Sequence, residues 1–241
     1  DAGNSRVESQ VGSVFGYTDL GYKNMVYLNF SARNDWTSTL QKPYNSFFYP
    51  SVSLSVIGSE IIQMPSFISY FKLRGSYANI SSDVSAYYTI PVYNSGTSWN
   101  GTPSLNLPGT IISPNIKPRK TISQEYGTEL RFLKNRIGLD VTYFKYLEKN
   151  FPKDVPISQA SGFNSIRLNA DEIYRKGLEI ILSGSPIRTK DLRWDITLNY
   201  SRLRRTVKSY YGGEDIRDGV KVGQRTDVYR TWAWERSPDG Q

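Results

Sequence analysis

Histidine and cysteine are both absent from this chain of 241 residues. Without cysteine there is no disulfide framework and no thiolate metal site. Without histidine the chain lacks the most common general base, the most common zinc ligand and the base of a Ser-His-Asp triad. Hydrolysis by a pair of carboxylates, as in a glycosidase, still fits this composition. We expect the chain to bind no metal and no cofactor.

Long hydrophobic runs are also missing, since no stretch approaches the roughly 18 apolar residues that a membrane-spanning helix needs. The opening "DAGNSRVESQ" has no secretory signal, and we expect the chain to be an internal piece of a longer protein. Aromatic residues, in contrast, make up 14% of the chain, and the formal net charge is +8. Such a charge favours anionic surroundings.

The segment "FFYPSVSLSVI" (47–57) alternates in polarity, with Val52, Leu54 and Val56 on one parity and serines between them. A period of two residues is that of a β-strand, whose side chains point to opposite faces in turn. The same alternation predicts eight antiparallel strands and no helix. The expected strands are Gln10–Tyr22, Met25–Trp36, Phe47–Gly58, Tyr70–Ile80, Ile122–Leu133, Arg136–Glu148, Glu172–Gly184 and Leu192–Lys208, and a ninth is expected to begin at Val228–Trp234.

Turn chemistry predicts how neighbouring strands pair. Asn tolerates the positive φ of a tight turn, and two-residue turns at 23–24 and 134–135 keep apolar side chains on one face. The expected pairs are Phe15 with Ala32, Tyr17 with Phe30, Leu130 with Leu139, and Tyr126 with Tyr143. Every second connection is long, at 37–46, 81–121, 149–171 and after Ser209. The pattern therefore predicts tight turns at one end of the sheet and long loops at the other.

Two architectures alternate apolar and polar faces in this way. A soluble β-sandwich is one alternative, but most of these strands are longer than the usual mode of about 5–6 residues. A transmembrane barrel uses strands of about 9–11 residues, with apolar side chains toward lipid and polar ones toward the lumen. Its periplasmic turns are short and its extracellular loops are long. The sequence thus favours an antiparallel all-β transmembrane barrel.

Charged residues are distributed unevenly between the two faces. On the polar face they nearly cancel, with Arg33, Lys72, Arg74 and Arg131 against Glu125, Glu129, Asp140, Glu179 and Asp195. The apolar parity, continued toward the long loops, reaches Lys145, Lys149, Lys176, Arg202 and Arg204. We expect these side chains to meet the phosphates of outer-membrane lipid and lipopolysaccharide, with a solvated loop base as the alternative. The segment "RLRR" (202–205) carries no known nucleic-acid motif, and no nucleic-acid partner is expected.

Several segments of the sequence, in this order along the chain, resemble SusC/RagA-type TonB-dependent outer-membrane transporters. They are "RNDWTSTL" (33–40), "FFYPSVSLS" (47–55), "KLRGSYA" (72–78), "PNIKPRKTISQEYGTELRFLKNRIGLDVTYF" (114–144), "NADEIYRKGLEIILSGSPI" (169–187), "WDITLNYSR" (194–202) and "RSPDGQ" (236–241). The chain departs from the usual pattern at Asp171, at Tyr174 and Arg175, and at Arg230, where a glycine usually follows tyrosine.

The resemblance implies a barrel of about 22 strands with a plugged lumen, located in the outer membrane of a Gram-negative cell. It implies TonB-energised import of oligosaccharides or peptides, with a SusD-like surface lipoprotein and the TonB complex as partners. Residues 1–241 would be part of one such barrel domain, an arc of eight or nine strands, with the plug, the first strands and the last strands outside this chain.

Ligand contacts are expected in the long loop at 81–121, where Tyr93, Trp99 and Asn100 could stack on and hydrogen-bond a sugar. The alternative is that these residues only pack the loop. In the expected register Glu129 faces Asp140, and a glycosidase needs two acids about 5–10 Å apart in a cleft. We expect no enzymatic activity, because the same wall carries neutralising bases, and we expect Glu125 and Glu129 to pair with Lys72 or Arg74. A soluble sandwich that binds carbohydrate or acts as an adhesin is the alternative function.

Overall fold

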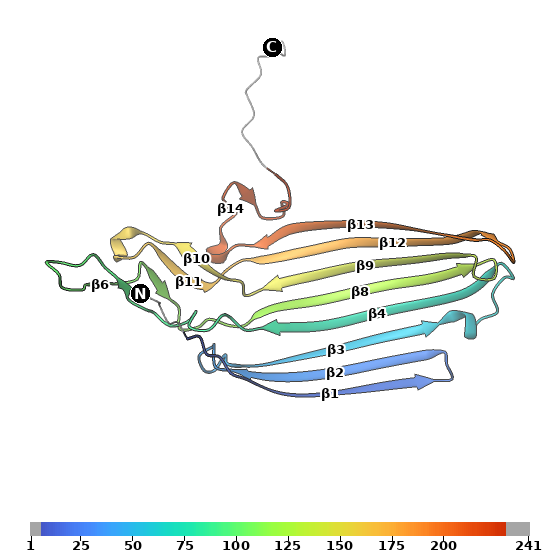
Figure 1. Cartoon of the computed structure of the whole chain (residues 1–241), viewed down its shortest axis with the longest axis horizontal. Coiled ribbons are helices and arrows are strands. Elements are labelled where there is room, and N and C mark those ends of the chain that lie inside the picture. Colours follow the sequence, from blue (N-terminus) through green and yellow to red (C-terminus); the bar gives the residue numbers. More distant parts are fainter. Residues whose placement is uncertain (1–5, 230–241) are drawn as a thin grey trace, which may run out of the picture.

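Eight long strands form a single antiparallel sheet in the computed structural model, which describes residues 6–229 (Figure 1). In sheet order they are β1 (Val11–Tyr22), β2 (Val26–Thr37), β3 (Ser46–Ile57), β4 (Ile68–Ser82), β8 (Arg119–Phe132), β9 (Ile137–Lys149), β12 (Glu172–Arg188) and β13 (Arg193–Ser209). All eight expected strands are confirmed. Within the described residues no helix has the length and apolar character needed to cross a membrane.

The connections sort by length, as the sequence predicts. Figure 1 shows tight turns at one end of the sheet and small sheets in the long loops at the other. The short connections include the 3₁₀ turn η1 (Gly58–Glu60). The long loops contain β5 (Asn94–Ser95), β6 (Leu105–Asn106), β7 (Thr110–Ile112), β10 (Pro152–Pro156), η2 (Gln159–Ser161), β11 (Ser165–Asn169), η3 (Tyr211–Gly213), β14 (Ile216–Arg217) and β15 (Val220–Lys221).

The register places apolar side chains of neighbouring strands opposite one another. Val52 lies opposite Phe30 on one side and Tyr77 on the other. Leu139 lies opposite Leu130 and Leu182, which confirms the register expected from the turn at 134–135. We call the face that carries these residues the apolar face, and the opposite one the polar face.

The first strand is registered differently from the prediction. The connection between β1 and β2 has three residues, 23–25, so that Tyr22 pairs with Val26. Tyr17 therefore lies opposite Ser31, and Phe15 lies opposite Arg33, both on the polar face. The predicted pairs of Tyr17 with Phe30 and Phe15 with Ala32 are wrong, because a shift of one residue moves every side chain to the other face.

The apolar face is not covered by any second layer within residues 6–229. Phe30, Leu54 and Leu198 are 50%, 45% and 60% exposed. The buried hydrophobic residues lie on the polar parity or in the loops, and they are Leu40, Phe47, Ile116, Phe144, Val155, Leu168 and Val207. A β-sandwich would bury the apolar face against a second sheet. The sandwich alternative is therefore wrong, and a large uncovered apolar face fits a membrane or an interaction surface.

The sheet does not close on itself, because β1 and β13 are its two edges within the described residues. The chain returns to pair with β13: Gly223 donates its backbone N–H to Val207 at 2.8 Å, and Thr226 donates to Arg205 at 2.9 Å. A bridge joins Thr206 to Arg225. Of the ninth strand expected at Val228–Trp234, residues 230–234 lie outside the described residues.

Gly177 tests the packing of the polar face. A Cβ at this position would overlap the Phe144 ring and lie 2.7 Å from the carbonyl oxygen of Arg202. This oxygen is a backbone atom and cannot rotate away as a side chain could. We expect Gly177→Ala in the full-length protein to lower the free energy of unfolding by about 1–3 kcal/mol, measured by urea titration.

Gly75→Ala is the matched control, since the nearest atom to its Cβ is a side-chain carbon of Tyr126 at 3.8 Å. We expect the control to change stability by less than about 0.5 kcal/mol. Equal effects of the two substitutions would contradict this packing.

Candidate functional site

The polar face carries a charge network that spans three strands. Arg74 of β4 binds Asp140 of β9 through two hydrogen bonds, of 2.8 Å and 2.6 Å, and donates to the Thr142 hydroxyl at 2.6 Å. To reach β9 the Arg74 side chain crosses β8 at Gly127, where a Cβ would lie 2.8 Å from its Cζ. A bidentate guanidinium–carboxylate pair is strong and has fixed geometry. The pair therefore ties β4 to β9 over the intervening strand.

The glutamates of β8 bind other partners than predicted. Glu129 accepts two hydrogen bonds from Arg131, of 2.9 Å and 2.7 Å, and Glu125 accepts one from the Tyr146 hydroxyl at 2.7 Å. The expected pairing of these glutamates with Lys72 or Arg74 is wrong. The prediction considered only adjacent strands, whereas Gly127 lets Arg74 reach one strand further.

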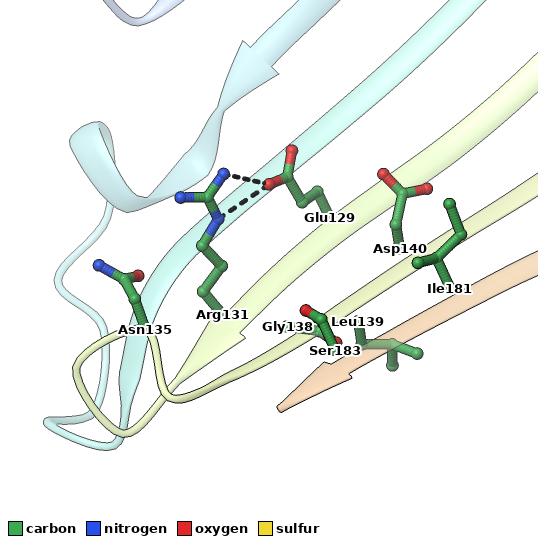
Figure 2. A pocket seen from close by; sticks show the side chains of 8 residues that line it. All are labelled: Glu129, Arg131, Asn135, Gly138, Leu139, Asp140, Ile181 and Ser183. Atoms are coloured by element: carbon green, nitrogen blue, oxygen red, sulfur yellow. Dashed lines mark hydrogen bonds and ion pairs between the residues drawn. The ribbon is translucent and has the colours of Figure 1, made fainter. Parts of the chain in front are cut away.

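A hollow of about 250 Å³ on the polar face contains the two acids considered for catalysis. Glu129 lies opposite Asp140, as predicted, and Figure 2 shows Arg131 bound to Glu129 beside this hollow. Each carboxylate is bound by a guanidinium, Asp140 by Arg74 and Glu129 by Arg131. Among residues 6–229 no group of acidic side chains could hold a metal ion.

A second cluster on the polar face lies near the long loops, around Glu148. The side chain of Glu148 is 5% exposed, and its Oε1 lies 3.0 Å from Nη2 of Arg119 and 3.0 Å from Nη2 of Arg175. Nη2 of Arg205 lies 3.9 Å from Oε2. Arg175 and Arg205 are directly opposite in the ladder between β12 and β13. One carboxylate thus holds three guanidinium groups together, and the cluster keeps a positive charge.

Sequence reasoning missed this cluster. Glu148 and Arg175 share the polar parity, but no tight turn links β9 to β12, so their register could not be counted from a turn. The register between β12 and β13 shifts between Gly184 and Ile187. A register predicted from the turn near Thr189 alone is therefore wrong beyond this shift. The alternation along each strand places these charged residues on the polar face. It does not show that they lie at the same level along neighbouring strands.

Two long loops are joined above the sheet. β7 pairs with β11, and β11 with β10, in one three-stranded sheet. Arg167 of β11 donates to both carboxylate oxygens of Asp154, at 2.7 Å and 3.0 Å, and to the backbone oxygen of Tyr88 at 3.1 Å. These hydrogen bonds lower the pKa of Asp154 below its usual range. The link is therefore intact at neutral pH and weakens only when acid protonates Asp154.

The expected ligand residues lie in the hairpin formed by β5 and β6. Trp99 and Thr102 exchange backbone hydrogen bonds of 2.9 Å and 2.8 Å, with Asn100 and Gly101 at positive φ between them. Asn100 thus has a turn-forming role, and Trp99 is 83% exposed at the hairpin tip. Tyr93, 65% exposed, lines an apolar cleft of about 300 Å³ at the base of the hairpin. The structure places Tyr93 and Trp99 at opposite ends of the hairpin rather than in one pocket.

Comparisons with known proteins agree with this architecture. The family model described as TonB dependent receptor-like, beta-barrel matches residues 1–234. The TonB-dependent receptor P39 of Formosa agariphila is 26% identical over 231 residues, which cover 92% of this chain and 22% of that protein. The TonB-dependent receptor SusC of Bacteroides thetaiotaomicron is 26% identical over 229 residues, covering 88% and 22%. The chain therefore spans about a fifth of the length of these curated relatives.

Solved structures share the fold at lower identity. The RagAB peptide transporter matches with a TM-score of 0.79 and 21% identity, covering 89% of this chain and 25% of that one. The siderophore receptor PirA from Pseudomonas aeruginosa matches with a TM-score of 0.53 and 18% identity, covering 83% and 37%. At these identities the likeness is one of fold.

The Glu148 cluster generates a stability prediction. Removing one partner of a fully buried ion pair costs about 3–5 kcal/mol. The three arginine side chains are 35–36% exposed, so we expect Glu148→Gln in the full-length protein to cost about 2 kcal/mol, measured by urea titration.

Glu179→Gln makes the same chemical change at an exposed position of the polar face and serves as the control, with an expected effect below about 0.5 kcal/mol. A Glu148→Gln protein as stable as the control would show that the cluster does not depend on this carboxylate.

Proposed function

The chain belongs to the TonB-dependent receptor β-barrel family, and on this premise we propose that it forms part of the wall of an importer for oligosaccharides or peptides. Members of the family are outer-membrane proteins, and this chain is a segment of such a barrel, with its apolar face toward lipid. The polar face then lines the lumen. The family consists of receptors and transporters, and import is the activity proposed here.

The observation that carries this proposal is the contrast between the two faces of one sheet. An uncovered apolar face is stable only against hydrocarbon or another apolar surface, whereas the polar face carries internally paired charges such as Arg74 with Asp140. The wall of an aqueous lumen must be polar, and a paired acid and base are polar without adding a net charge that would bind ions. The long loops, joined by Arg167, then lie on the extracellular side.

The partners follow from the relatives. The similarity to SusC and to the RagAB peptide transporter supports a SusD-like surface lipoprotein over the extracellular loops, and TonB as the source of energy. The similarity to RagAB, a peptide transporter, supports peptides as one substrate class. Oligosaccharides, the other class, are what the resemblance of the sequence to SusC/RagA-type transporters implies. Outer-membrane lipid and lipopolysaccharide contact the apolar face.

The chain is proposed to be one arc of a larger barrel, with residues 1–241 inside a single barrel domain. The support is the open sheet: in a bilayer each edge must pair with another strand, because an unpaired backbone group in hydrocarbon costs several kcal/mol. The contacts of residues 223–226 with β13 begin such pairing at one edge. At the other edge, β1 requires a neighbour from elsewhere in the full-length protein.

Substrate contacts are proposed for Trp99 and Tyr93, with Asn100 shaping the hairpin between them. An indole that is 83% exposed offers a flat apolar surface for a sugar ring or an aromatic peptide side chain. The separation of Trp99 and Tyr93 along the hairpin suits an extended ligand rather than a compact one.

Uptake measurements test the proposal. Cells that express the full-length transporter should take up labelled oligosaccharide or peptide in a TonB-dependent manner, and the SusD-like lipoprotein should co-purify. We expect Trp99→Ala to raise the half-saturating concentration about tenfold, because losing a stacking contact of about 1–1.5 kcal/mol weakens binding by that factor.

Trp36→Ala is the control, an aromatic residue of β2 on the apolar face. Uptake that persists without TonB would refute active import. Uptake that is unaffected by Trp99→Ala would remove this residue from the ligand site while leaving the import proposal standing.

A further inference from the structure

A row of basic side chains crosses three strands on the apolar face. Lys145 of β9 lies directly opposite Lys176 of β12, and Lys176 lies directly opposite Arg204 of β13. Lys176 and Arg204 are exposed, and Lys145 is half-buried. Like charges directly opposite in a sheet are destabilising. Three of them in one row require a compensating group.

The described residues supply no such group. Within residues 6–229 neither Lys145, Lys176 nor Arg204 forms an ion pair with a carboxylate. The acid of this region, Glu172, is bound instead by Lys208 at 2.6 Å and lies 3.7 Å from Lys149. The row therefore keeps its full positive charge on a face whose other side chains meet hydrocarbon.

The ring of Tyr174 lies close to the ammonium groups of three lysines. The Nζ atoms of Lys145, Lys176 and Lys208 lie 4.9 Å, 5.3 Å and 5.7 Å from the centroid of the Tyr174 ring. Cation–π contacts hold each ammonium group near the ring face. Lys145 and Lys176 thus form a concentrated positive site, because the tyrosine ring carries no net charge to neutralise them, whereas Lys208 is paired with Glu172.

The height of this row in the membrane follows from its neighbours. Tyr143 precedes Lys145 by two residues along β9 and pairs with Tyr126 of β8 on the apolar face. At about 3.4 Å per residue, this tyrosine pair lies roughly 7 Å from the basic row, toward the middle of the strands. Outer-membrane barrels place such exposed tyrosines at the boundary of the hydrocarbon layer. The basic row therefore lies just beyond that boundary, on the side of the long loops, at the level of lipid headgroups.

We propose that Lys145, Lys176 and Arg204 bind a phosphate group of lipopolysaccharide in the outer leaflet. This inference rests on the outer-membrane location in the proposed function, and not on import. A phosphate oxygen accepts charge-assisted hydrogen bonds from ammonium and guanidinium groups, and its negative charge removes the repulsion within the row. The apolar side chains below the tyrosines pack against the acyl chains of the same lipid.

The test uses the full-length transporter purified from outer membranes in mild detergent. The variant is Lys145→Gln/Lys176→Gln/Arg204→Gln. The control, Lys23→Gln/Lys134→Gln/Lys190→Gln, makes the same change in charge at the tight turns on the opposite side of the membrane. Lipid A released from each protein is quantified by mass spectrometry. We expect the control to retain lipopolysaccharide and the variant to lose most of it.

Rebinding identifies the source of the phosphate. Protein stripped of lipid is titrated with lipopolysaccharide, with enzymatically dephosphorylated lipopolysaccharide and with inorganic phosphate. Each basic group near an anionic surface contributes a factor of about five in affinity, so we expect the variant to bind lipopolysaccharide roughly 100-fold more weakly than the control. Dephosphorylated lipopolysaccharide should bind the unsubstituted protein as weakly as the intact lipid binds the variant.

Equal binding by variant and control, or equal affinity for dephosphorylated lipid, would overturn the proposal. Inorganic phosphate that binds as tightly as lipopolysaccharide would also overturn it, by assigning the row to a free anion. Because binding is measured without transport, a failure of the import proposal leaves these results unaffected.

Discussion

The structure depends on one constraint: a backbone N–H or C=O group inside a bilayer must find its hydrogen-bond partner within the protein. A sheet satisfies this demand only if its ladder is continuous, and β1 to β13 form an unbroken antiparallel ladder in which each strand pairs with the next one in the sheet. Once the ladder is fixed, the parity of each residue decides which medium it meets. Leu54, Leu139 and Leu198 fall on the apolar face, and Arg74 and Asp140 on the polar one.

The two faces solve different electrostatic problems. On the polar face, charges have protein partners: Gly127 gives Arg74 room to reach Asp140, and Glu148 joins three arginines in a cluster that keeps a positive charge. On the apolar face, the basic row of Lys145, Lys176 and Arg204 has no protein counter-ion within the described residues, and lipid phosphate is the proposed substitute. The charges on the polar face are thus held by protein partners, whereas the basic row on the outer surface near the loops depends on the membrane.

The sequence predicted the strands, the sorting of the loops and the register at the turn 134–135, because a period of two and a tight turn are local signals. It failed at β1, where a third residue in the turn moved Phe15 and Tyr17 to the polar face. It also missed the Glu148 cluster, because the heights of residues on strands joined by long loops are set by the whole ladder. Tyr93 and Trp99 could be selected as aromatic residues of a long loop. Their separation, with one at the base and one at the tip of a hairpin, could be seen only in the structure.

Spin labels along β3 test most directly which medium meets each face. The chain has no cysteine of its own, so single substitutions such as Ser53→Cys and Leu54→Cys give one labelling site each within it. In the full-length protein reconstituted into bilayers, labels at Val52, Leu54 and Val56 should be more accessible to oxygen, which concentrates in hydrocarbon. Labels at Ser51, Ser53 and Ser55 should be more accessible to a water-soluble nickel chelate. Loss of this alternation, or its reversal, would contradict the assignment of the apolar face to lipid.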